Sequence, residues 1–175
     1  MSEQYPALPA ARSVADILLR GREPRPAASL VRLPIYPWLV VGTTCIAAFI
    51  GQVDASIVQL ALPRLELAFD ARLHAVSWVA IGYVLAFASF LPVFARLAEM
   101  LGRKLMYLLG FGLFGVTSAL CGFAPSLAWL IAFRVLQGAS GAMLGANSIV
   151  ILVTAIEPAR KSRALGLFAT AQRSA

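Results

Sequence analysis

The sequence is poor in charge, because Asp, Glu, Lys and Arg make up only 13% of its 175 residues while 60% are hydrophobic. Soluble domains carry roughly 25% charged residues, so this composition excludes an ordinary soluble globular protein. Histidine occurs once, at His74 in a polar stretch, which excludes a catalytic or metal site built on histidine. The sequence also lacks a GxxxxGK[ST] phosphate loop, which excludes ATP hydrolysis by the usual route. We therefore expect a protein that is not an enzyme.

Cysteine is scarce as well. Cys45 and Cys121 are the two cysteines, and both fall within long apolar stretches. Their spacing fits neither a disulfide framework nor a metal-ligand set. We interpret both as small packing residues and expect no metal.

Apolar stretches of about 20 residues dominate the sequence, and this is the length that crosses a hydrocarbon core of roughly 30 Å. They predict an all-α membrane protein: a tail at 1–37 followed by a partial helix bundle at 38–175. Pro63 closes the first stretch and Pro125 precedes the fourth, as expected of residues that lack a backbone N–H. The predicted spans are 38–62, 77–94, 105–123 and 127–154, with a fifth helix starting near Ala164.

The net charge of +7 would suggest nucleic acid as a partner in a soluble protein, but the basic residues lie between the apolar stretches. Lys and Arg are retained on the cytoplasmic side of a membrane. With the N-terminus inside, the outer loops hold only Arg64 and Arg72. The cytoplasmic segments hold Arg12, Arg20, Arg22, Arg25, Arg32, Arg96, Arg103, Lys104, Arg160, Lys161 and Arg163. We expect no nucleic acid, and a multi-pass protein of a bacterial-type plasma (inner) membrane with a cytoplasmic N-terminus.

Two charges stand inside predicted spans, Asp54 in the first and Arg134 in the fourth. Each would cost about 2.5 to 3.5 kcal/mol at a helix centre on insertion scales. Asp54 lies nine residues before Pro63 and Arg134 nine residues after Pro125. Both therefore lie roughly 13 Å from the same membrane face. An ion pair or a shared aqueous cavity is available if these spans are neighbours, and a pair that only fixes helix packing is the alternative.

Polar residues accompany both charges. Gln52, Ser56 and Gln59 form a stripe beside Asp54 on the first span, and they are candidates to line a cavity. Asn147 on the fourth span is a fourth candidate. The glycines that share a face with Arg134 would let another backbone approach; they are Gly138, Gly141 and Gly145.

Three motifs resemble a known transporter family. The segment VDASIVQLALPRL at 53–65 resembles the end of the first helix in the major facilitator superfamily, specifically its fourteen-span EmrB/QacA drug-resistance transporters. The segment RVLQGASGA at 134–142 resembles the RxxQGxGxA motif of the family, matching at Arg134, Gln137 and Gly138, with Gly141 one residue beyond the second glycine of the motif. The order and spacing of the motifs match across about residues 38–168.

The third motif is ARLAEMLGRK at 95–104, which resembles the family's GxLADRxGRK loop. It matches at Leu97, Ala98, Gly102, Arg103 and Lys104, whereas Ala95, Glu99 and Met100 replace glycine, aspartate and arginine. Glu99 keeps the carboxylate, and its i, i+4 relation to Arg103 allows a salt bridge. The resemblance implies a loop that latches inward and outward states; the alternative is a basic loop that only sets orientation.

The resemblance implies two bundles of six helices around a central cavity and export of hydrophobic or cationic small molecules. It implies that the proton gradient is the energy source, that no other cofactor is used, and that Asp54 and Arg134 take part in proton coupling. Four spans and part of a fifth cannot form that cavity alone. We therefore expect a truncated portion of a transporter that lacks the C-terminal helices of the full protein. The alternative is a small four-span protein that homo-oligomerises or assists assembly of a partner.

Overall fold

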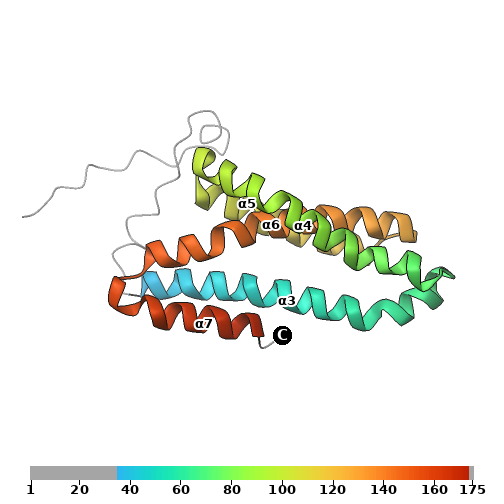
Figure 1. Ribbon diagram of the computed structural model, residues 1–175, viewed down its shortest axis with the longest axis horizontal. Helices are drawn as coiled ribbons and strands as arrows, with labels where there is room; N and C mark the ends of the chain where they lie inside the picture. Colours follow the sequence, from blue (N-terminus) through green and yellow to red (C-terminus); the bar gives the residue numbers. More distant parts are fainter. Residues whose placement is uncertain (1–34, 174–175) are drawn as a thin grey trace, which may run out of the picture.

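The computed structural model describes residues 35–173, which fold into helices joined by short turns, without a strand in that range (Figure 1). Four of the helices are long and apolar enough to cross a membrane. The protein is therefore an all-α, multi-pass integral membrane protein. The expected tail at 1–37 lies outside the described residues except for 35–37. The helices are α3 (Tyr36–Phe69), α4 (Leu73–Leu101), α5 (Arg103–Gly122), α6 (Leu127–Ala155), the short 3-10 helix η1 (Pro158–Arg160) and α7 (Lys161–Arg173).

Helix α6 is the centre of the bundle. Half of its most apolar window is buried inside the protein, whereas only 6% of the corresponding window of α3 is buried. Its neighbours are α4, α5, α3 and α7, and α7 lies beside α3 (Figure 1). Side chains on α6 can therefore contact several helices at once, so a polar site formed by several helices is expected to include α6.

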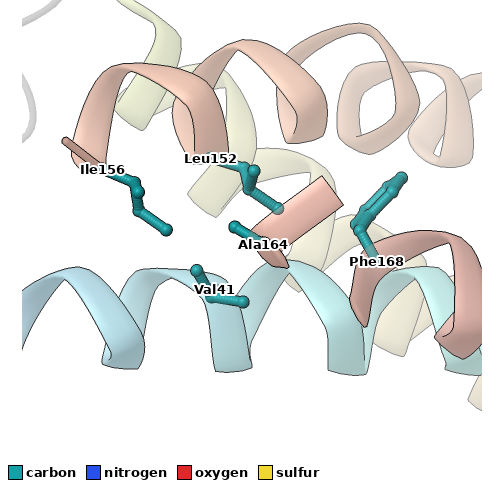
Figure 2. Close-up of a cluster of buried hydrophobic side chains, with 5 residues drawn as sticks. All are labelled: Val41, Leu152, Ile156, Ala164 and Phe168. Carbon is teal, nitrogen blue, oxygen red and sulfur yellow. The ribbon is translucent and has the colours of Figure 1, made fainter. Parts of the chain in front are cut away.

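An apolar cluster fixes one end of α6 to α3 and α7. Leu152 and Ile156 of α6, Val41 of α3, and Ala164 and Phe168 of α7 are all buried and point toward one another (Figure 2). Burying apolar side chains contributes roughly 25 cal/mol per Å². The cluster holds α7 in place, and this helix begins at Lys161 rather than near Ala164 as expected.

The expectation that Pro63 closes the first span is wrong. Helix α3 continues past Pro63 to Phe69 and ends where Asp70 adopts a left-handed conformation (φ 47°), with its N–H bonded to the carbonyl of Glu66. Proline removes a single backbone donor, and the leucine, glutamate and alanine residues that follow favour helix. At 34 residues, α3 is about 50 Å long and exceeds the hydrocarbon core.

The expected loop at 95–101 is instead the last part of α4, which runs from Leu73 to Leu101 rather than over 77–94. Alanine, leucine, glutamate and methionine in this stretch favour helix. The break comes at Gly102, whose φ of 105° is a conformation that residues with a side chain rarely adopt. Helix α5 then starts at Arg103. The predicted spans 105–123 and 127–154 agree with α5 and α6 to within two residues.

Candidate functional site

The two charges predicted at one depth form an ion pair. Arg134 Nη1 donates to Asp54 Oδ2 at 2.7 Å and to the Oε1 of Gln137 at 2.6 Å. Gln137 Nε2 donates in turn to Asp54 Oδ1 at 3.0 Å. Each carboxylate oxygen therefore accepts a hydrogen bond, and the three side chains close a triangle between α3 and α6. The side chain of Arg134 is 4% exposed and that of Asp54 17% exposed.

Two further helices complete this network. From α4, the Val79 carbonyl accepts a hydrogen bond from Arg134 Nε at 3.4 Å, and the ring of Tyr83 lies 4.8 Å from the guanidinium carbon. From α5, the Cys121 thiol donates to Gln137 Oε1 at 3.6 Å. The sequence reasoning missed Tyr83 and assigned Cys121 to packing alone. The sequence did carry a signal for Tyr83, because a tyrosine within an apolar span needs a hydrogen-bond partner for its hydroxyl group.

The glycine face of α6 lies against α4, as the sequence predicts for a close approach of backbones. A Cβ atom at Gly138 would overlap the backbone carbonyl oxygen of Tyr83. At Gly141 it would lie 3.0 Å from the Tyr83 hydroxyl, and at Gly145 3.0 Å from the ring of Phe87. These three glycines let α4 approach closely enough for Tyr83 to reach Arg134.

A cavity of about 410 Å³ lies among helices α3 to α7 beside this network. Of the four candidates for its lining, Gln52 forms part of the wall, whereas Ser56, Gln59 and Asn147 do not. The cavity meets α3 only over residues 47–55, and the stripe continues beyond it toward Pro63. Asn147 is fully buried in α6, where its Nδ2 bonds to the Met143 carbonyl.

The residues of the predicted loop motif at 95–104 lie at the junction of α4 and α5, apart from the Asp54–Arg134 ion pair. Glu99 forms salt bridges with Arg96 at 2.9 Å and with Arg103 at 3.9 Å. Leu97 packs against a buried cluster formed by Ala98, Met106 and Met143. Lys104 follows Arg103 in the first turn of α5, after the break at Gly102. The glutamate–arginine pair expected from the spacing is present, and Arg96 is an additional partner.

Replacing Glu99 by glutamine is expected to lower the free energy of unfolding by only about 0.3 to 0.5 kcal/mol, because both ion pairs are exposed to solvent. Unfolding by SDS in bicelles, followed by circular dichroism, measures this change. It should vanish at 1 M salt, where charges are screened beyond about 3 Å. A loss of several kcal/mol would show that this carboxylate stabilises the folded bundle.

The Asp54 network makes a charged carboxylate tolerable inside the bundle. Among the described acidic residues, Glu66 and Glu99 lie in the last turn of their helices and Asp70 and Glu157 outside the long helices, so Asp54 alone lies mid-span. Ionisable groups at such positions are rare and mark ion or substrate paths. The arrangement holds the Asp54 carboxylate of α3 against the guanidinium of Arg134 on the neighbouring helix α6.

Comparison with known proteins agrees with this architecture. The chain is 31% identical over 131 residues to the uncharacterized MFS-type transporter YvkA of Bacillus subtilis, covering 75% of this chain and 30% of that protein. It is 31% identical over 132 residues to the tetracenomycin C resistance and export protein of Streptomyces glaucescens, covering 75% and 24%. It is 35% identical over 131 residues to the multidrug resistance protein Stp of Mycobacterium tuberculosis, covering 74% and 24%.

The chain thus spans 24% to 30% of the length of these relatives. No solved structure matches it significantly. The sequence profile of the Major Facilitator Superfamily matches residues 44–173, which include most of α3 and all of α4, α5, α6 and α7. Together with the ion pair and the motifs that hold it, this match assigns the chain to the Major Facilitator Superfamily.

Proposed function

We propose that the chain forms part of a proton-coupled exporter in the drug-resistance branch of the superfamily. The observation that carries this proposal is the mid-span carboxylate of Asp54, held by Arg134 and Gln137. Two relatives are named for tetracenomycin C resistance and export and for multidrug resistance, which supports a hydrophobic or cationic small molecule as substrate. The helices that follow in the longer relatives are the implied partners.

The proposed coupling depends on the distance between two charges. The guanidinium of Arg134 stabilises the ionised carboxylate of Asp54, and burial opposes that charged form. A movement of α3 relative to α6 that separated the pair would therefore favour binding of a proton by Asp54. Alternation between paired and separated states would exchange a proton for a substrate, with the proton gradient as the energy source.

The orientation in the membrane is part of the proposal. Six of the nine described Lys and Arg residues outside the ion pair lie near the α4–α5 junction and η1, whereas Arg64 and Arg72 lie near the turn between α3 and α4. Retention of Lys and Arg on the cytoplasmic side supports placing the end with the α4–α5 junction and η1 inside the cell, in a bacterial-type inner membrane. The N-terminus would then be cytoplasmic.

Replacing Asp54 by asparagine in an exporter that contains this chain is expected to abolish proton-dependent export. The amide keeps the shape of the side chain but cannot exchange a proton. Efflux of a fluorescent substrate from cells, with and without a protonophore, measures the change at matched protein levels. The matched control is Glu157→Gln, the same chemical exchange at an exposed site between α6 and η1, which should export normally. Proton-dependent export by the asparagine variant contradicts the proposal.

A second assay addresses the role of the chain by itself. Cells that produce the 175-residue chain are compared, in drug susceptibility and dye efflux, with cells that produce it extended through the downstream coding sequence. We expect efflux only from the extended protein, because this chain spans 24% to 30% of the length of the transporters that it resembles. Proton-dependent efflux from the 175-residue chain would favour transport by an oligomer of four-span subunits.

A further inference from the structure

The guanidinium of Arg134 is held by helix α4 as well as by Asp54. Its Nε donates to the Val79 carbonyl at 3.4 Å, and its central carbon lies 4.8 Å from the centroid of the Tyr83 ring. Guanidinium groups stack on aromatic faces, and this attraction is stronger where water is excluded. Arg134 is buried within this chain. The two contacts with α4 do not involve the carboxylate on α3.

Helices α4 and α6 touch through their backbones at this level. An added Cβ at Gly138 would overlap the carbonyl oxygen of Tyr83, and one at Gly141 would lie 3.0 Å from the Tyr83 hydroxyl oxygen. Small residues at such a contact let two backbones approach closely, and closely packed groups move together. Helix α3 is bonded to the same part of α6 through the side chain of Asp54. Moving α3 away from α6 thus breaks side-chain hydrogen bonds here, whereas α4 and α6 stay together.

An arginine side chain is long and has several rotatable bonds, so a free guanidinium can follow a carboxylate that moves away. The Asp54–Arg134 pair would then persist in both states, and the proton affinity of the carboxylate would not change. Exchange of a proton by separation of the two charges therefore requires the guanidinium to be held by groups other than Asp54. Val79 and Tyr83 of α4 and Gln137 of α6 meet this requirement.

We propose that Tyr83 is a positioning residue whose ring keeps Arg134 with α4 and α6 when Asp54 moves away with α3. This inference rests on the proposed function and states how the ion pair is made to separate. The Val79 carbonyl and the Gln137 amide each form one hydrogen bond with the arginine, whereas the guanidinium lies over the face of the Tyr83 ring. A ring face limits how the guanidinium can tilt. Because the face makes this contact, phenylalanine should substitute for Tyr83 and leucine should not.

The anchoring of Arg134 is tested by NMR of isotope-labelled arginine side chains in the purified chain in nanodiscs. The Nε–H signal of Arg134 is identified by its absence from Arg134→Lys. In Asp54→Ala, which removes the carboxylate, we expect the order parameter of this N–H bond to stay at about 0.85, as in rigid groups. Adding Tyr83→Leu should lower it below about 0.6, whereas adding Tyr83→Phe should not. Phe90→Leu, at an exposed ring of the same helix, is the matched control.

A second measurement keeps Asp54 in place and does not depend on the folding of the alanine variant. The Nε–H of Arg134 donates to the Val79 carbonyl, so its rate of hydrogen exchange reports how firmly α4 holds the guanidinium. Tyr83→Leu should raise this rate roughly threefold, because the guanidinium leaves the carbonyl more often without the ring. Tyr83→Phe and the Phe90→Leu control should leave the rate unchanged.

The consequence for transport is measured in an exporter that contains this chain. Tyr83→Leu should lower proton-driven efflux against a substrate gradient about tenfold, because an arginine that follows Asp54 keeps the carboxylate ionised in both states. Efflux down a substrate gradient should stay within about twofold, since it needs no proton exchange. Tyr83→Phe should retain both activities.

Three results would each overturn the inference: an order parameter that falls in Asp54→Ala alone or stays high without the ring, an unchanged exchange rate in Tyr83→Leu, or an equal loss of both kinds of efflux. The NMR measurements do not require transport. Their failure would therefore leave the export proposal standing. An anchored Arg134 in an exporter that ignores Asp54→Asn would contradict only the export proposal.

Discussion

Replacing Arg134 by leucine is expected to destabilise the bundle by about 3 to 5 kcal/mol, because it leaves the carboxylate of Asp54 without its counter-ion. Only 17% of that side chain is exposed, so water cannot take the place of the guanidinium. Gln137 would lose its Arg134 donor at the same time. The free energy of unfolding, measured by SDS titration in bicelles, gives the loss directly.

A double-mutant cycle separates the pair from its surroundings. Asp54→Leu alone leaves a buried arginine without a counter-ion and should cost a similar amount, whereas the double variant buries neither charge. We expect it to be about 2 kcal/mol or more stable than the sum of the two single losses predicts. Arg64→Leu, at an exposed position of α3, serves as the control and should change stability by less than about 0.5 kcal/mol. Additive single losses would show that the two charges do not stabilise each other.

Replacing Gly138 by alanine is expected to cost about 3 kcal/mol, although alanine is normally the better helix former. The added methyl group would overlap the Tyr83 carbonyl oxygen and lie 3.1 Å from the Cα of the same residue. Because this obstacle is backbone, α4 and α6 must move apart as whole helices. Val79 and Tyr83 would then withdraw from Arg134. Thermal unfolding in detergent, followed by circular dichroism, measures the loss.

The control is the same substitution where space is open. At Gly112 on α5, an added Cβ meets nothing within 4 Å, so Gly112→Ala should leave stability unchanged or raise it by up to about 1 kcal/mol. Equal effects at the two glycines would show that the contact between α4 and α6 tolerates a methyl group. A lower melting temperature confined to Gly138→Ala is the expected result.

The all-α membrane fold could be predicted from the sequence because a bilayer imposes a fixed length of apolar residues on every span. The fourth span agrees with α6 to within one residue. The sequence placed Asp54 and Arg134 at one depth by counting nine residues from Pro63 and nine from Pro125 at 1.5 Å per residue. The ion pair confirms that the two groups meet, although α3 continues past Pro63 to Phe69. The Glu99–Arg103 pair likewise followed from local helix geometry.

The sequence by itself thus determined the features set by distance along the chain: spans, depths and neighbours one turn apart. Only the tertiary structure decided that α3 continues through Pro63, that Gly102 alone separates α4 from α5, and that Tyr83 and Cys121 join the network of Asp54. The physical reason is that these contacts depend on which helices are adjacent and how each is rotated. Close packing against α6 fixes both, and that information is spread over the side chains of every helix.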